Sequence, residues 1–213
     1  MQCFKILGKR ENPLDGYLNV PLLWAFDIKH DRCKHARCMG GGHCYPKIDP
    51  QDSTSTMVSL DTICLAFLAA QLQGLKCLTA DVSLAYIQSF TKEKVYTVAG
   101  PEFGELSGRN MIIEKALYGL QGSGNAWHAR FADDLYSMNF TPSKADPDLW
   151  MRKCDNHYEY VAVFVDDILI FSKNPEEILK KIKYDLKNVG PPENYNGAGP
   201  MVYFCKDLYQ EYL

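Results

Sequence analysis

The sequence predicts an α+β fold in which helices pack on one face of a β-sheet. Segments with the periodicity of helices and segments with that of strands follow one another irregularly, unlike the regular alternation of a parallel α/β protein. The 213 residues are 46% hydrophobic and 12% aromatic, and the formal net charge is −3. This composition excludes an intrinsically disordered chain and supplies enough apolar residues for a core in one or two domains.

The N-terminal quarter is predicted to start irregularly and then become extended. Residues 1–23 contain Pro13, Gly16 and Pro21 and show little periodicity, so we expect an irregular lead-in. A strand is expected at 22–29, where branched and aromatic residues cluster. The stretch HDRCKHARCMGGGHCYPKIDP that follows is charged and contains three consecutive glycines, which predicts a loop or a hairpin.

The middle of the chain is predicted to contain one buried helix and three strands. A helix is expected over 54–72, because apolar residues recur there at helical spacing with few charges. Strands are expected where branched and aromatic residues cluster, at 75–82, 94–100 and 110–116, with a helical turn at 85–90 after the first of them.

The clearest helical pattern lies between 125 and 139. Its large apolar residues recur at the spacing of an amphipathic helix: Trp127, Phe131, Leu135 and Met138. Strands are expected at 149–151, 158–165 and 168–172. A last helix is expected after Asn174, where an Asn-Pro pair and a following Glu mark a helix start, with apolar residues at helical spacing as far as Leu186.

Two adjacent carboxylates, Asp166 and Asp167, interrupt the apolar run FVDDILI and are predicted to form the tip of a hairpin. Burying an unpaired carboxylate costs several kcal/mol, so a cation is expected near them. Asp81 ends another apolar strand. If the two strands are neighbours, three carboxylates can hold two divalent ions about 4 Å apart, an arrangement suited to phosphoryl transfer. The alternative is an ordinary polar hairpin turn, because Asp-Asp is common in turns.

Charge is distributed unevenly along the chain. Residues 1–50 hold eight Lys and Arg against five Asp and Glu, and the remainder is acidic. This pattern fits an anionic ligand and a metal site, and it equally fits an uneven but solvated surface. No run reaches the ~18 apolar residues of a membrane span, and no secretory signal is recognisable. We therefore expect no membrane partner. Because the eight cysteines are scattered singly, we also expect an intracellular protein that is not secreted.

Histidines and cysteines in the basic stretch offer a different interpretation, a zinc knuckle that binds nucleic acid. HARCMGGGH has ligand types at suitable spacing, but Ile48 stands where a fourth ligand would be needed, so we expect no zinc. The candidate ligands are His30, Cys33, His35, Cys38, His43 and Cys44.

Three motifs in order, ADVSLAY, KALYGLQGSGNAWHARF and EYVAVFVDDILIF, resemble those of reverse transcriptases from copia-type (Pseudoviridae-like) LTR retrotransposons. The segments between the motifs resemble the same family, so the likeness runs from about residue 26 to residue 198. The resemblance implies a right-hand polymerase fold in which this chain supplies fingers and palm. Residues 24–75 would then be mainly fingers and 76–213 mainly palm with an inserted fingers portion, the thumb being truncated or absent.

The resemblance also implies which residues form the active site. Asp81 and Asp166 would be ligands of two Mg²⁺ ions, or of Mn²⁺, with Asp167 beside them as a further catalytic carboxylate. Tyr86 stands where the family stacks an aromatic ring under the sugar of the incoming nucleotide and selects dNTP over rNTP. Without the resemblance, Tyr86 would be interpreted as a half-buried aromatic residue after a strand.

Further residues are implied to bind the nucleotide. Arg37 matches the arginine of the fingers that approaches the triphosphate, and Lys34 is assigned with it, although Lys34 and His35 are transposed relative to the family. Gly119 and Gln121 belong to the segment that contacts the nucleotide and the templating base, and Gln121 stands where a basic residue is usual. The alternatives are a solvated basic hairpin and a flexible connection into the helix at 125–139.

We therefore expect an RNA-directed DNA polymerase that adds dNTPs to a primer 3′-hydroxyl, paired with an RNA or DNA template. We expect it in cytoplasmic virus-like particles or the nucleus, with the RNase H and integrase domains of the polyprotein encoded elsewhere. One alternative is a decayed, inactive fragment that folds and binds nucleic acid. Another is a nucleotidyl cyclase with the same palm fold, which would not need a primer and template.

Overall fold

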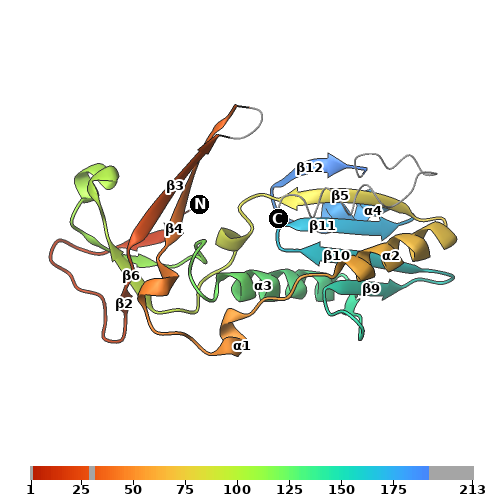
Figure 1. Cartoon of the computed structure of the whole chain (residues 1–213), viewed down its shortest axis with the longest axis horizontal. Coiled ribbons are helices and arrows are strands. Elements are labelled where there is room, and N and C mark those ends of the chain that lie inside the picture. Colours follow the sequence, from red (N-terminus) through yellow and green to blue (C-terminus); the bar gives the residue numbers. More distant parts are fainter. Residues whose placement is uncertain (1, 29–31, 192–213) are drawn as a thin grey trace. The chain divides into compact units, whose positions relative to one another are not determined.

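The computed structural model describes residues 2–28 and 32–191, which form two compact units (Figure 1). The first unit contains residues 1–55 and 85–130, and the second contains 56–84 and 131–213. His30 of the zinc-knuckle interpretation lies outside the described residues, as does the segment after 191. Within the part of the chain that is described, no helix is long and apolar enough to cross a membrane.

A four-stranded sheet in the order β1-β7-β6-β2 organises the first unit. Its strands are β1 (Phe4–Ile6), β7 (Asn110–Ile113), β6 (Val95–Val98) and β2 (Leu18–Asn19). The predicted strands at 94–100 and 110–116 are confirmed. Residues 1–23, which were expected to be irregular, instead supply β1 and β2. These strands are three and two residues long, too short to show the alternation by which a strand is recognised in a sequence.

The predicted strand at 22–29 and the hairpin after it are confirmed. β3 (Leu22–Ile28) and β4 (Lys34–Gly40) form a separate antiparallel pair, in register from Leu22 opposite Gly40 to Ile28 opposite Lys34. Short helices follow elsewhere in this unit: η1 (Gly42–Cys44), α1 (Pro50–Ser53), η2 (Tyr86–Gln88) and η3 (Pro101–Leu106). The helical turn expected at 85–90 is η2.

α3 (Ser123–Ser137) confirms the helix predicted at 125–139, and its sequence starts in the first unit and ends in the second. The apolar residues on its predicted buried face, Trp127, Phe131 and Leu135, are each at most 2% exposed.

A six-stranded antiparallel sheet in the order β12-β5-β11-β10-β9-β8 forms the centre of the second unit (Figure 1). The strands are β5 (Lys76–Val82), β8 (Thr141–Pro142), β9 (Leu149–Lys153), β10 (Tyr158–Phe164), β11 (Asp167–Ser172) and β12 (Leu186–Gly190). The α+β class is confirmed, as are the strands predicted at 75–82, 149–151, 158–165 and 168–172.

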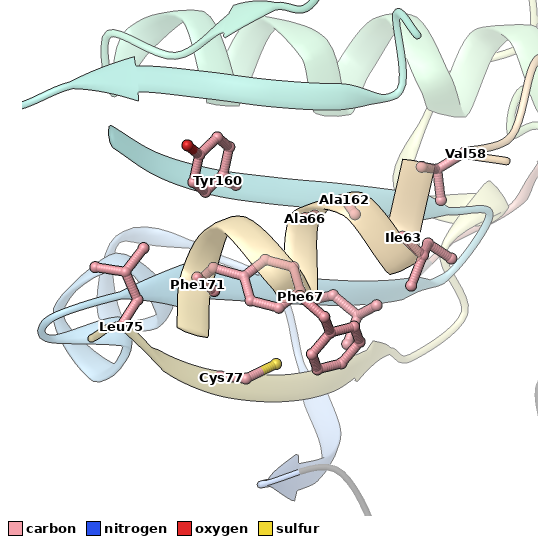
Figure 2. Close-up of a cluster of buried hydrophobic side chains, with 11 residues drawn as sticks. Val58, Ile63, Ala66, Phe67, Leu75, Cys77, Tyr160, Ala162 and Phe171 are labelled. Atoms are coloured by element: carbon pink, nitrogen blue, oxygen red, sulfur yellow. The ribbon is translucent and has the colours of Figure 1, made fainter. Parts of the chain in front are cut away.

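α2 (Leu60–Leu72) covers one face of this sheet (Figure 2). Phe67 packs edge-on against Phe171 of β11, with ring centroids 4.9 Å apart. The alternate residues of β11, Ile168 and Ile170, are also buried, so the central strands are covered on both faces. α2 begins six residues later than predicted, because the Ser59 hydroxyl accepts a hydrogen bond from Thr62 N–H and caps the helix there.

α4 (Pro175–Lys181) begins where the Asn-Pro pair predicts, although the Asn174 side chain makes no capping hydrogen bond. The helix does not continue to Leu186 as expected. Leu186 instead begins β12, which pairs with β5. Ile182 and Leu186 are four positions apart, a spacing that fits a helix or a strand over so short a segment. The pairing with β5 determines that Leu186 is in a strand.

Candidate active site

Asp81 and Asp167 lie directly opposite each other on neighbouring antiparallel strands. They are register partners in the β5–β11 pair, and the next residue along, Val82, donates its N–H to the Asp166 carbonyl at 2.8 Å. Cross-strand partners point to the same face, with Cβ atoms ~4.5–5.5 Å apart. The structure therefore brings two of the three predicted carboxylates together, although 86 residues separate them in the chain.

The third carboxylate, Asp166, sits in the two-residue turn between β10 and β11. Phe164 pairs with Asp167, so only Val165 and Asp166 connect the strands. Val165 has φ of +57°, a left-handed conformation that costs a β-branched residue roughly 1–3 kcal/mol. The paired strands and the Val82 hydrogen bond hold this turn in place. The predicted hairpin with acids at its tip is confirmed, with Asp167 as the first residue of β11.

The chemistry of this edge favours a hard cation. The three aspartates are each partly exposed, and Ala80, Val82 and Ile168 beside them are at most 2% exposed. Like charges directly opposite each other destabilise a sheet, so a cation between them is favourable, and carboxylate oxygens are the donors that Mg²⁺ prefers. Among the described residues, the three carboxylates do not form a group with oxygens within 4.8 Å of one another. The donor set fits a divalent ion, and side-chain rotation would have to bring the oxygens onto it.

A lysine that the sequence analysis did not single out completes this row of charges. Lys187 of β12 is the register partner of Asp81 on the side away from Asp167. The cross-strand order is therefore Lys187, Asp81, Asp167. The helix predicted after Asn174 extended to Leu186, the first residue of β12, and no strand was predicted there, so no sequence signal indicated that Lys187 lies beside Asp81.

Tyr86 lies in the first unit and stacks on Tyr118, with ring centroids 4.4 Å apart and planes inclined by 29°. Both rings are partly buried. Tyr118 directly precedes Gly119, so the structure brings Tyr86 to the segment that was also predicted to contact the nucleotide.

Gly119 is required by the approach of two backbones. Its φ is +86°, and a Cβ there would lie 2.3 Å from the Gly40 carbonyl oxygen. Gly40 N–H donates to the Tyr118 carbonyl at 2.7 Å, and Gly42 N–H donates to the Gly119 carbonyl at 3.1 Å. The absence of a side chain at Gly119 thus lets residues 40–42 approach its backbone closely.

The side-chain amide of Gln121 forms hydrogen bonds with the backbone of the segment 42–48. Its Nε2 donates to the Gly42 carbonyl at 2.7 Å, and its Oε1 accepts from Ile48 N–H at 3.0 Å. The family resemblance implies that Gln121 belongs to a segment that contacts the nucleotide and the templating base. In the structure both ends of the amide hold residues 42–48 to the loop at 119–122.

Tyr45 and Glu93 complete the same network and were not predicted. The Tyr45 hydroxyl donates to Glu93 and accepts from Gln121 N–H, and Glu93 also accepts from Gly122 N–H at 2.8 Å. Burial raises the pKa of Tyr45, and the neighbouring Glu93 raises it further, so the hydroxyl stays protonated. We call Tyr45, Glu93, Gln121 and their backbone partners the Gln121 clamp.

Lys34 and Arg37 both lie on β4 and are exposed. They are three positions apart, so their side chains leave opposite faces of the hairpin. His35 shares the face of Arg37. By the same alternation, His35 and Cys38 of the zinc-knuckle interpretation point to opposite faces. Within the described residues, no three ligand types of 33–44 have their donor atoms within 4.8 Å of one another.

Residues 10–198 match the family model of the reverse transcriptase (RNA-dependent DNA polymerase). The chain belongs to this family. It is 28% identical over 190 residues to a retrovirus-related Pol polyprotein from transposon TNT 1-94 of Nicotiana tabacum, covering 82% of this chain and 14% of that protein. It is 26% identical over 160 residues to the Pol polyprotein from transposon RE1 of Arabidopsis thaliana, covering 71% and 11%. The chain therefore spans about a seventh of the length of the first relative.

Among solved structures, a foamy viral protease-reverse transcriptase in complex with double-stranded DNA aligns with a TM-score of 0.45 and 16% identity. The alignment covers 78% of this chain and 24% of that one. The family model confirms the resemblance to reverse transcriptases that the three motifs indicate.

Proposed function

We propose that this chain is the polymerase portion of a retrotransposon Pol polyprotein of copia type. It would extend a primer 3′-hydroxyl with dNTPs, directed by an RNA or DNA template. The observation that carries the proposal is the register of Asp81 opposite Asp167, with Asp166 in the turn beside them, in a chain of the reverse transcriptase family.

Asp81, Asp166 and Asp167 would hold two Mg²⁺ ions, or Mn²⁺. When bound, such ions lower the pKa of the attacking hydroxyl and neutralise charge on the leaving pyrophosphate. The strands β5 and β11 fix the backbones of the carboxylates, and the strained turn at Val165 sets the direction of Asp166. Lys187, in register with Asp81, supplies a positive charge suited to phosphate oxygens.

Four residues of the first unit are proposed to bind the nucleotide on the strength of the family resemblance. Tyr86 would lie under the sugar, Arg37 would bind the triphosphate, and Lys34 and Gly119 would lie close to the nucleotide. Gln121 would act indirectly, because its amide holds the segment 42–48 in place. We propose that RNase H and integrase belong to the remainder of the polyprotein, and that the protein works inside the cell.

Primer extension on an RNA template tests this proposal. Asp167→Asn removes one of the paired carboxylates and should lower extension with Mg²⁺ by roughly 1,000-fold or more, because metal ligation is worth several kcal/mol in such reactions. Asp133→Asn, an exposed acid on α3, is the matched control and should extend normally. Circular dichroism checks that each variant folds.

Equal extension by the wild type and Asp167→Asn would refute the assignment of the site. If the folded wild type binds primer and template but does not extend them in Mg²⁺ or Mn²⁺, the chain is the inactive fragment that formed the alternative interpretation.

A further inference from the structure

The turn between β9 and β10 gathers three metal-ligating side chains that the polymerase proposal does not use. Arg152 pairs with Glu159 and Lys153 with Tyr158, so residues 154–157 form the turn, closed by Cys154 N–H donating to the His157 carbonyl at 2.9 Å. The Cys154 sulfur, a ring nitrogen of His157 and a carboxylate oxygen of Glu159 all lie within 4.8 Å of one another. Among the described residues, they are the only such group.

The orientation of His157 prepares one ring nitrogen for a ligand. Nδ1 lies 3.0 Å from the Asn156 side-chain oxygen, which can only accept, so Nδ1 carries the proton and donates. The neutral ring then has its lone pair on Nε2. That atom is buried and has no hydrogen-bond partner, a condition that is unfavourable unless something binds there. A histidine that donates from its other nitrogen is typical of metal sites.

Glu159 is buried but ionised. Its carboxylate accepts from Arg152 Nε at 2.9 Å and from the Ser172 hydroxyl at 2.5 Å. A second Arg152 nitrogen, Nη2, donates to the same carboxylate oxygen at 2.5 Å, and the Cys154 thiol also hydrogen-bonds to the carboxylate. The carboxylate is therefore held in one orientation by its ion pair with Arg152, and the lone pair that the Cys154 thiol occupies becomes open to a cation when that thiol loses its proton.

We propose that Cys154, His157 and Glu159 bind a zinc ion, with water as the fourth ligand. Thiolate, imidazole and carboxylate are the donors of zinc sites, with bonds of ~2.0–2.3 Å. Donor atoms on one tetrahedral zinc lie ~3.3–3.8 Å apart by that geometry, so the side chains need to close by about 1 Å. On binding, the Cys154 thiol transfers its proton to solvent and the sulfur bonds to the metal.

This site is separate from the three aspartates. Glu159 is near the start of β10, and Asp166 follows the end of that strand, seven residues or about 24 Å along the chain. The proposal departs from our expectation that the chain binds no zinc. That expectation concerned residues 30–48, where the fourth ligand is absent. Glu159 lies in the strand predicted at 158–165, where nothing in the sequence indicates a metal ligand.

Cobalt substitution tests the proposal, because Co²⁺ bound to a thiolate absorbs in a charge-transfer band that Co²⁺ on oxygen donors does not show. The full chain, reduced and freed of metal, is titrated with Co²⁺. The expected result is one equivalent bound with the thiolate band, displaced by Zn²⁺. Cys154→Ser should abolish the band, and His157→Gln should weaken binding by about 10-fold or more.

Two variants separate this site from others in the chain. Cys44→Ser removes an exposed cysteine of the alternative zinc-knuckle stretch, and Asp167→Asn alters the aspartate site; both should keep the band. Zn²⁺ should also raise the melting temperature of the wild type but not that of Cys154→Ser. Absence of the band in the wild type, its persistence in Cys154→Ser or its loss in Cys44→Ser would each overturn the proposal.

Discussion

Because Gly119 has no side chain, two segments of the backbone can pack closely against each other. Its left-handed backbone and its contact with the Gly40 carbonyl are separate constraints on the same residue. Gly108 is subject only to the backbone constraint. Its φ is +79°, and nothing lies within 4 Å of where a Cβ would be. The two glycines therefore form a matched pair.

Alanine at each glycine should separate these constraints. Gly108→Ala should cost about 1–2 kcal/mol of unfolding free energy, the cost of a left-handed L-residue. Gly119→Ala should cost about 1–3 kcal/mol more, because the added carbon meets backbone that cannot rotate away. Urea denaturation of both variants measures the difference. Equal losses would contradict the close approach of residues 40 and 119.

Gln121 contributes to stability through the Gln121 clamp. Gln121→Ala leaves Ile48 N–H and the Gly42 carbonyl without their side-chain partner, and should lower the free energy of unfolding by about 1–3 kcal/mol. Gln71→Ala, at an exposed position of α2, should change it by less than about 0.5 kcal/mol. The same urea measurement decides. A Gln121→Ala variant as stable as the Gln71→Ala control would show that the amide is not needed for the fold.

At the scale of elements, α2 depends on an acid that lies far from it in the sequence. The Asp146 carboxylate accepts from Ser59 N–H at 3.0 Å, at the residue that caps the helix, and from Asp148 N–H at 3.0 Å. Burial raises the pKa of Asp146, but these hydrogen bonds and those from the Ser59 and Thr62 hydroxyls outweigh it, so the pKa is lowered. The stability of the start of α2 therefore depends on the ionisation of Asp146 and so on pH.

The stability that Asp146 contributes depends on pH. Because the pKa of Asp146 is lower in the folded chain, its carboxylate contributes stability above about pH 4, and this is lost as pH falls toward the folded value. Asp146→Asn should therefore be less stable at pH 7 and should lose less stability than the wild type between about pH 5 and pH 2. Asp133→Asn should follow the wild-type curve. Parallel curves for all three would contradict the role of Asp146.

At the scale of the whole molecule, the sequence predicted most long elements but not how they pair. Helical periodicity identified α3, and apolar, branched and aromatic segments identified β5, β6, β7, β9, β10 and β11, whereas β8, only two residues long, was not predicted. β1, β2 and β12 depend on partners distant in the chain, so their own residues carry little signal. The aspartates were recognisable as acids within or at the end of apolar strands, whereas Lys187 and the Gln121 clamp became recognisable only through contacts.

The strand order of the sheet in the second unit also determines how long β5 waits for its partner strands during synthesis. β5 carries Asp81 and lies between β12 and β11, both of which come later in the chain. Asp167 is synthesised 86 residues after Asp81, which takes about 4–17 s at ~5–20 residues per second. Throughout that interval both edges of an apolar strand lack their native partners. The nascent chain is therefore exposed to aggregation at the strand that carries Asp81, and its yield should depend on chaperones that cover β5 until β11 emerges.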